Sequence, residues 1–498
     1  MLAAAALVRL ADLAAIPYPI VLVVGGLAIG LVPALPDVAL EPEIVFLVFL
    51  PPLLHAAGYQ SSPRELRAEI RGLSFLAIAL VLLTMGAVAV VAHALVPGLS
   101  WQAAFVLGAV VAPTDPVSAA ATFTRIPVPE RVSLLVEGEA MLNDATALVA
   151  YRLAVAAALS GTFDAGTAAV DFVLSAAGGI GIGLAAGWLE VRVLRRQADT
   201  ALTIFLTVGA AYGAYIAAEE AGASGVLAAV TSGLYLGWFS HVAFDADTRL
   251  TAIGFWQVLV FGLNAMLFTL LGLALPGLVD ELRGELSLGE LTGAALVVSL
   301  TVIGVRVAAQ FVPFAFPGGS WRERVVVGWS GMRGAISLAA ALSIPLSVEA
   351  RPQILYLTFV VLLVTLVGQG LTLPALLHVL RVEGPRQWMP DEAVARLEAA
   401  QAALDRLDEL GDEGLDEDVL RRLREIYRER FRACMAVIGG QDGRPPPDPR
   451  REYGAVRRDL INVERETLLR LRNAGRLRQE TWRLIERDLD LDEARLPV

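Results

Sequence analysis

Apolar runs of about 20 residues, the length that an α-helix needs to cross a bilayer, recur from the start of the chain to about residue 380. Proline, glycine or charged residues separate these runs, and 56% of the 498 residues are hydrophobic. The pattern predicts an all-α membrane protein with twelve or thirteen transmembrane helices. Residues 1–16 carry Arg9 and Asp12, which favours a hydrophobic or interfacial helix over a cleavable signal peptide. We place twelve spans, at residues 17–35, 43–60, 72–96, 101–123, 131–160, 168–192, 200–218, 222–240, 251–275, 287–315, 323–346 and 353–381.

The arginines predict the orientation of the chain, since its sequence contains no lysine. They are concentrated in alternate loops, and the positive-inside rule places those loops and the C-terminal tail in the cytoplasm. We therefore expect a multi-pass protein of the cell inner (plasma) membrane. The arginines of the cytoplasmic loops are Arg64, Arg67, Arg71, Arg125, Arg131, Arg192, Arg195, Arg196, Arg249, Arg322 and Arg324.

The last part of the chain differs from the rest, because the composition after Gly384-Pro385 changes abruptly to charged residues with helical periodicity. Segments at 391–435 and 451–490 are amphipathic, and a stretch rich in glycine and proline separates them. We expect two domains, a membrane domain at 1–384 and a cytoplasmic α-helical domain at 385–498. For the second domain, a regulatory or dimer-supporting role and a passive helical tail are equally open.

One predicted membrane helix contains acidic residues, in the stretch Glu137-Gly-Glu139-Ala-Met-Leu-Asn143-Asp144. An ionisable side chain near the bilayer centre costs several kcal/mol unless it is paired or faces water, so these residues are functional candidates. Glu139 and Asn143 stack one turn apart on the helix, whereas Asp144 points to a neighbouring face. Counted from Arg131, Asp144 lies roughly 20 Å into the bilayer at 1.5 Å of helix rise per residue.

Asp115 lies at a similar depth, between two prolines in Pro113-Thr114-Asp115-Pro116. Proline cannot donate a helical hydrogen bond, so this pair predicts a broken helix inside the bilayer. The freed carbonyls, the half-helix ends and Thr114 are able to ligate a cation. A second, weaker interruption at residues 365–374 predicts a crossing partner from an inverted repeat.

Arg333 is the third charged side chain that we place near the middle of the membrane. An arginine at this depth needs a permanent partner, and we expect Glu139 to be that partner, which leaves Asp144 uncommitted. A direct pair between Arg333 and Asp144 is the alternative, and it would weaken a cation site. Arg306 and Arg152 lie nearer to the predicted membrane faces, so we expect them to snorkel or to have a structural role.

Three motifs occur in a fixed order and at similar membrane depth: Pro113-Thr-Asp115-Pro116, Glu137-Gly-Glu139 leading to Asn143-Asp144, and Gly331-Met-Arg333-Gly334. With them the chain resembles, over about residues 17–381, the electroneutral sodium/proton exchanger family of the monovalent cation:proton antiporter superfamily. It is most similar to bacterial members with a helical cytoplasmic tail.

The resemblance implies a homodimer of protomers with two inverted repeats, broken crossing helices, a core domain and a dimer scaffold domain. It also implies roles for individual residues. A monovalent cation would bind at Asp144 and Thr114, with Asn143 and Asp115 also at the ion-binding site, and Glu139 and Arg333 would form a structural ion pair.

The sequence departs from the family's pattern at two positions, where alanine replaces a side chain that carries oxygen. Leu50-Pro51-Pro52-Leu53-Leu54 matches the family's third-helix motif, and Ala56 stands where an acidic residue often follows it. Ala140 stands where many archaeal members have serine. These departures leave the choice of cation open.

The resemblance implies a secondary active transporter that exchanges Na⁺, or alternatively Li⁺ or K⁺, for H⁺ in an electroneutral 1:1 cycle. Alternating access would come from movement of the core domain, and roles in pH homeostasis and sodium tolerance would follow. A K⁺/H⁺ antiporter shares every motif, while a cation channel and an intramembrane aspartyl protease that uses Asp115 and Asp144 are more distant alternatives.

We expect no enzyme activity, no cofactor and no nucleic-acid partner, only the bilayer, protons and monovalent cations. The single cysteine, Cys434, and the four scattered histidines do not have the spacing of a metal site.

Overall fold

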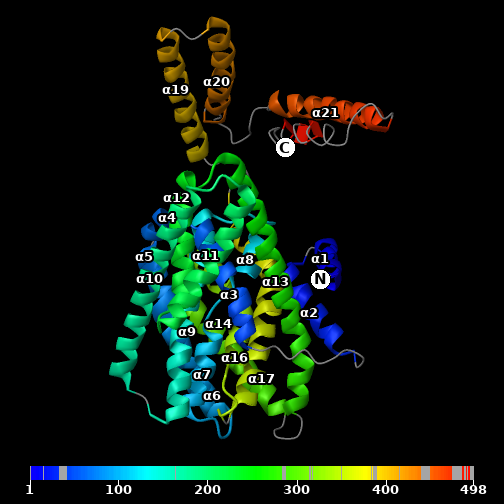
Figure 1. Ribbon diagram of the computed structural model, residues 1–498. Coiled ribbons are helices and arrows are strands. Elements are labelled where there is room, and N and C mark those ends of the chain that lie inside the picture. The colour runs from blue at the N-terminus through cyan, green and yellow to red at the C-terminus, as the bar shows by residue number, and fades with distance from the viewer. Residues whose placement is uncertain are drawn as a thin grey trace. The chain divides into compact units, whose positions relative to one another are not determined.

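The computed structural model describes residues 2–14, 16–32, 42–162, 164–282, 288–312, 316, 318–348, 350–382, 384, 390–413, 416–438, 449–473, 485–486, 489–490 and 492–493. Every regular element in these ranges is a helix, which confirms the all-α prediction for the described chain (Figure 1). The chain divides into two compact units, Met1–Gly384 and Pro385–Val498. We describe each unit by itself.

The first unit begins with helices that contain the acidic stretch and the proline-flanked aspartate. In order they are α1 (Leu2–Ala14), α2 (Tyr18–Gly30), α3 (Pro42–Gln60), α4 (Pro63–Ala68), α5 (Ile70–Ser74), the π-helical η1 (Phe75–Ala79), α6 (Leu80–Leu95), α7 (Trp101–Val111), α8 (Pro116–Phe123), α9 (Glu130–Ser160) and α10 (Ala165–Leu194).

The unit continues with α11 (Thr200–Glu220), α12 (Gly225–Ala243), α13 (Ala246–Leu282), α14 (Leu288–Ala309), α15 (Trp321–Trp329), α16 (Ala335–Leu342), α17 (Arg351–Leu363), the π-helical η2 (Val364–Gln369) and α18 (Gly370–Leu380). Each of the twelve predicted spans therefore coincides with one helix or with two or three consecutive helices that are joined or broken.

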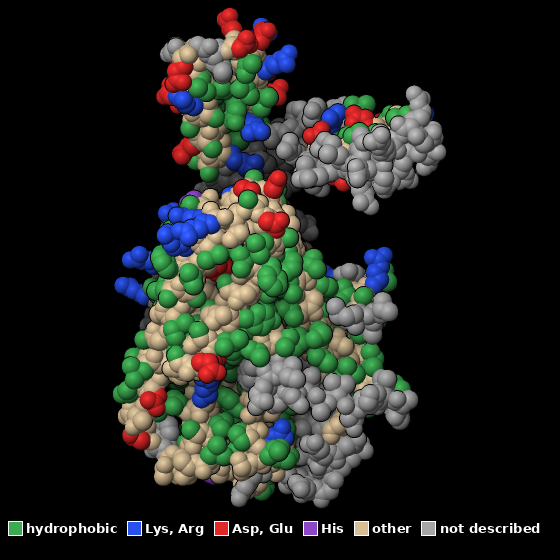
Figure 2. Space-filling model, viewed as in Figure 1, with side chains coloured by type: hydrophobic (Ala, Val, Ile, Leu, Met, Phe, Trp, Pro, Cys, Tyr) green, Lys and Arg blue, Asp and Glu red, His purple; other side chains and the backbone are tan. Residues whose placement is uncertain are grey.

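Nine helices or joined helical runs among the described residues are long and apolar enough to cross a bilayer. The other three predicted spans coincide with the shorter apolar helix α2, with α3 and with the pair α15–α16. α10 leaves most of its apolar side chains exposed, as expected for a helix that faces lipid. On the face seen in Figure 2, hydrophobic side chains cover the middle of this unit, and most of its exposed arginines lie toward one end.

Two spans are broken in the middle. The first break separates α7 from α8 at residues 112–115, where the two prolines predicted it. The second separates α15 from α16 at residues 330–334. The predicted interruption at 365–374 is wrong, because η2 and α18 continue the helix through Pro374. A π-helical turn precedes the proline there, and such turns occur mostly as single turns inside α-helices.

The two breaks cross in direct contact. The backbone N–H of Asp115 donates to the carbonyl oxygen of Met332 over 2.7 Å. A Cβ atom at Gly334 would lie 2.5 Å from the Cβ of Asp115, so only glycine permits this approach. The expected crossing of two broken helices is thus confirmed, with a different second partner.

The second unit contains α19 (Pro390–Asp412), α20 (Glu417–Ile438) and α21 (Pro449–Asn473). The amphipathic segment predicted at 391–435 is two helices packed against each other, with Arg424 and Asp408 joined over 2.7 Å. A new helix begins there, and the Asp416 side chain caps α20 by accepting from the N–H groups of Asp418 and Val419. Part of the segment predicted at 451–490, residues 474–484 and 487–488, lies outside the described residues.

Candidate ion-binding site

Arg333 lies in the second break, and its guanidinium closes the end of the first half-helix. The Nη1 group donates to the carbonyl oxygen of Ala112, the residue that follows α7. The last carbonyls of a helix lack N–H partners and carry a partial negative charge, so a cation there is stabilising. The backbone N–H of Arg333 donates to the Thr365 hydroxyl over 3.2 Å, which fixes the break against η2.

Glu139 is paired with Arg306 of α14, and the predicted pair with Arg333 is wrong. Both carboxylate oxygens of Glu139 accept from Arg306, one of them over 2.9 Å, and both residues are 1% exposed. Arg306 also donates to the carbonyl oxygen of Val327 in α15 over 3.2 Å. The ion pair therefore joins α9, α14 and α15.

The motif glycine Gly331 explains how Arg306 reaches this place. A Cβ atom at position 331 would overlap the Nε and Cδ atoms of Arg306, so a side chain there would displace the guanidinium. Of the two arginines expected to snorkel or to be structural, Arg306 is thus structural. Arg152 forms a half-exposed ion pair with Glu219 of α11 over 2.5 Å.

Asp115 caps the second half-helix, α8. Its two carboxylate oxygens accept from the backbone N–H of Val117 over 3.3 Å and from the Ser118 hydroxyl over 3.0 Å. An aspartate at this position satisfies donors that the helix leaves free. Both oxygens of Asp115 are therefore engaged, although the side chain lines the cavity described below.

Asn143 lies behind the cavity wall and positions Thr114. Its Nδ2 group donates to the Thr114 hydroxyl over 2.7 Å, and it is 1% exposed. Asn143 is not among the residues that line the cavity, whereas Thr114 is. The amide therefore connects α9 to the first break and acts on the cavity through Thr114.

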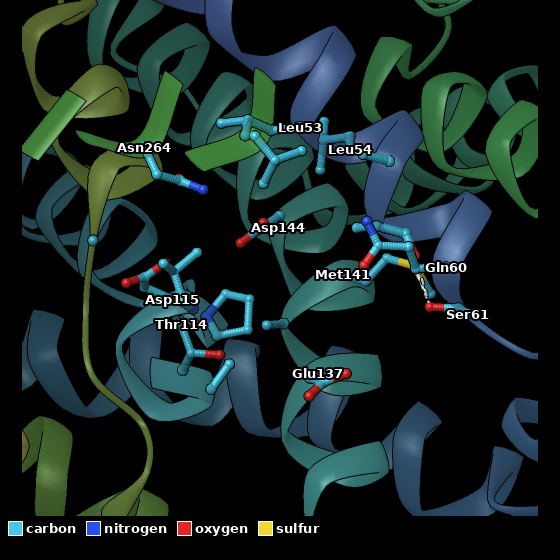
Figure 3. Close-up of a pocket in the computed structure, with 18 of the residues that line it drawn as sticks. Leu53, Leu54, Gln60, Ser61, Thr114, Asp115, Glu137, Met141, Asp144 and Asn264 are labelled. Atoms are coloured by element: carbon cyan, nitrogen blue, oxygen red, sulfur yellow. Dashed lines mark hydrogen bonds between the residues drawn. The ribbon is translucent and has the colours of Figure 1, made fainter. Parts of the chain in front are cut away.

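Asp144 lines a cavity of about 680 Å³ together with Thr114 and Asp115. Its side chain is 4% exposed, and its Oδ1 atom is buried without a hydrogen-bond partner among the described residues. No ion pair joins Asp144 to Arg333 or to another described arginine. Figure 3 shows the Asp144 carboxylate at the cavity, across from Asp115 and Thr114. This side chain is thus the acid that the surrounding structure leaves uncommitted.

The cavity wall also includes exposed acids near the beginning of α9 and in α4: Glu130, Glu137 and Glu65. Arg131 lies at this same end of α9, which the distribution of arginines predicts to be cytoplasmic. Asp144 therefore communicates with exposed residues on the predicted cytoplasmic side.

Sequence reasoning missed two buried polar residues of the cavity, Asn264 of α13 and Ser337 of α16. The only signal for them was a neutral polar side chain within an otherwise apolar span. The alanines that replace oxygen-bearing residues, Ala56 and Ala140, line the same cavity.

A cavity with one buried carboxylate that no described residue pairs, a neighbouring hydroxyl and broken helix ends can hold either a proton or a monovalent cation. Oxygen ligands of this kind suit hard cations, and half-helix ends near a transporter's midplane are typical ion sites.

Known proteins are similar to this chain over most of its length. The family described as "Sodium/hydrogen exchanger, transmembrane" matches residues 1–379. An uncharacterised Na⁺/H⁺ exchanger of Mycobacterium tuberculosis is 34% identical over 96% of this chain and 91% of its own length. The Na⁺/H⁺ antiporter ApNhaP of Aphanothece halophytica is 34% identical over 79% of this chain and 75% of its own.

Among solved structures, the sodium proton antiporter MjNhaP1 of Methanocaldococcus jannaschii at pH 8 superposes with a TM-score of 0.63. It is 20% identical and is matched over 76% of this chain and 95% of its own, a likeness that shows the fold.

Proposed function

The chain belongs to the sodium/hydrogen exchanger family, and from this membership and the geometry at Asp144 we propose that it exchanges one Na⁺ for one H⁺. Members of the family are cation/proton antiporters and not enzymes, so the protein is a transporter. The observation that carries the proposal is the buried, unpartnered Oδ1 of Asp144 in the cavity wall.

Competition for one carboxylate is sufficient for exchange. Asp144 binds a proton or a cation but not both, so binding of either one displaces the other. Burial helps because it disfavours the free carboxylate and favours either loaded form.

A 1:1 stoichiometry follows from the residues around Asp144. Its neighbour Asn143 is neutral, and the carboxylate of Asp115 is engaged in capping α8. One site then trades one positive charge for another, and the cycle moves no net charge. The membrane potential, worth roughly 2.3 kcal/mol per charge per 100 mV, would do no work on such a cycle.

Alternating access requires the cavity to open on the other side as well. We propose that the crossing helices and α9 move as a core domain against the rest of the membrane unit, in a homodimer with its tail in the cytoplasm of a plasma membrane. In this setting the exchanger would support pH homeostasis and sodium tolerance.

Reconstituted vesicles with an internal pH dye test the proposal. Sodium added outside should move protons in the wild type, and Asp144→Asn should abolish this signal. Glu137→Gln is a matched control, because Glu137 is an exposed acid in the wall of the same cavity. Proton movement at the wild-type rate in Asp144→Asn would refute the assignment.

The same vesicles test stoichiometry and ion choice. With the sodium and proton gradients balanced, a clamped membrane potential should drive no net proton movement, whereas proton movement driven by the potential would exclude a 1:1 cycle. Sodium, lithium, potassium and rubidium added in turn decide between Na⁺ and K⁺ as the transported ion.

A further inference from the structure

The cavity must offer a cation more oxygen than the predicted site residues supply. A cation that leaves water needs ligands that replace its hydration shell. Asp144, Thr114 and Asp115 line the cavity with side-chain oxygens, although those of Thr114 and Asp115 already accept hydrogen bonds, and Asn143 lies behind the wall. Ala56 and Ala140 face the cavity without any oxygen. Further ligands are needed from elsewhere in the wall.

Asn264 presents a carboxamide to the cavity from α13. It is 5% exposed, and no described residue forms a hydrogen bond with its side chain. Figure 3 shows its amide end pointing toward Asp144 from the opposite side of the cavity. A carboxamide oxygen is a good ligand for a hard cation, and the amide N–H₂ group can donate to the carboxylate when no cation is bound.

Ser337 presents a free hydroxyl from α16, just after the second break. It is 1% exposed, and its Oγ atom is buried without a hydrogen-bond partner among the described residues. A buried hydroxyl without a partner is unfavourable unless something in the cavity binds it.

Two other hydroxyls of the wall do not share this property. The Ser61 hydroxyl donates to the carbonyl oxygen of Ala57 over 2.7 Å and contacts the sulfur of Met141. The Thr114 hydroxyl accepts from Asn143. Asn264 and Ser337 are therefore the buried, neutral side chains of the described cavity wall whose polar atoms have no protein partner.

We propose that Asn264 and Ser337 complete the coordination of the cation at Asp144 and set the selectivity among monovalent cations. The inference rests on the proposed exchange at Asp144. In this arrangement Asp144 and Thr114 ligate the ion from the first half of the membrane unit, and Asn264 and Ser337 ligate it from the second half. They take the place of the oxygens missing at Ala56 and Ala140.

Exchange by Asn264→Ala and Ser337→Ala in vesicles tests the proposal, with the apparent KM measured separately for sodium, lithium and potassium. Loss of one oxygen ligand should raise the KM for the preferred ion about tenfold or more, the effect of losing one bond to a charged group. The KM ratios among the three ions should change, because ions of different size depend differently on each ligand. Ser337→Thr, which keeps the hydroxyl, should retain the wild-type ratios.

Ser61→Ala is the matched control, since it removes a hydroxyl of the same wall that is already engaged, and its KM values should stay unchanged. Gel filtration of each variant verifies folding before reconstitution. Unchanged KM values in Asn264→Ala and Ser337→Ala, or an equal rise for all three ions, would overturn this inference. Asp144→Asn, measured in parallel, distinguishes the two failures, because exchange that persists in that variant would refute the proposed function itself.

Discussion

Arg306→Met should destabilise the membrane unit strongly, because it removes one half of a buried ion pair and nearly preserves the side-chain volume. The side chains of Arg306 and Glu139 are 2% and 1% exposed. Without the guanidinium, Glu139 is left buried without a cation, which typically costs about 3–5 kcal/mol. The carbonyl oxygen of Val327 also loses a donor, at about 1–3 kcal/mol if no water replaces it.

A double-mutant cycle with thermal unfolding in detergent measures this coupling. Glu139→Gln alone should also destabilise the protein, because it leaves Arg306 buried without its countercharge. The double variant Arg306→Met/Glu139→Gln should recover much of the loss, since most of the penalty comes from the unpaired charge and not from the missing contact. Tryptophan fluorescence during heating reports the unfolding temperature of each variant.

Arg152→Met is the control, because it removes an arginine from an arginine–glutamate pair that is partly exposed instead of buried. Arg152 and Glu219 are 49% and 28% exposed at the side chain, so this pair should contribute no more than about 1 kcal/mol. The same double-mutant cycle can also contradict the pairing of Glu139 with Arg306. If Glu139→Gln rescued Arg333→Met and failed to rescue Arg306→Met, the pairing of Glu139 with Arg306 would be wrong.

Two further predictions concern the second break and the competition at the site. Gly331→Ala should reduce both stability and exchange, because its Cβ would overlap Arg306. Gly304→Ala is the control: Gly304 lies on the same α14 helix as Arg306, but a Cβ there would meet open space, so neither property should change. Equal unfolding temperatures for the two variants would contradict this prediction. In the pH range where Asp144 mostly holds a proton, the apparent KM for sodium should rise about tenfold for each unit that the pH falls, because one proton excludes one cation. A maximal rate that falls while the KM stays constant would contradict simple competition.

The first break could be predicted from the sequence, and the second could not, for a physical reason. Pro113 and Pro116 lack the N–H groups that a helix requires, so they interrupt it whatever surrounds them. The second break contains no proline. Its glycines, Gly331 and Gly334, matter because of what lies against them, Arg306 and Asp115, and such contacts between distant segments are not encoded locally.

Burial of Arg306 was missed because depth along a helix does not measure burial. Arg306 lies three residues before the end of α14, a position from which an arginine would normally reach the membrane surface. Two neighbouring helices supply partners that keep the Arg306 side chain buried, Glu139 from α9 and Val327 from α15. Counting residues from a span end therefore gave the wrong partner for Glu139.

Asp144 could be predicted from the sequence, and Ser337 and Asn264 could not, because a buried charge costs far more free energy than a buried neutral polar group. A carboxylate in an apolar helix is costly enough to signal function. A serine or threonine is not, since it commonly donates to a carbonyl of its own helix, as Ser299 and Thr301 do in α14. Only the tertiary structure reveals that Ser337 and Asn264 lack such a partner.

The charges at the crossing also bear on how exchange avoids leakage. Two arginines and three carboxylates meet there, so the empty site has one negative charge in excess: Arg306, Arg333, Glu139, Asp115 and Asp144. Arg306 is held by Glu139 and Arg333 by the end of α7, which leaves the excess charge at Asp144. In the proposed cycle a proton or a monovalent cation at Asp144 would neutralise it equally, so both loaded forms would cross the membrane interior at similar cost. The empty form must carry an uncompensated charge through a medium of low dielectric constant, which is unfavourable. In the proposed cycle, return of the empty site would thereby be suppressed, and movement of the cation in one direction would require a proton in the other.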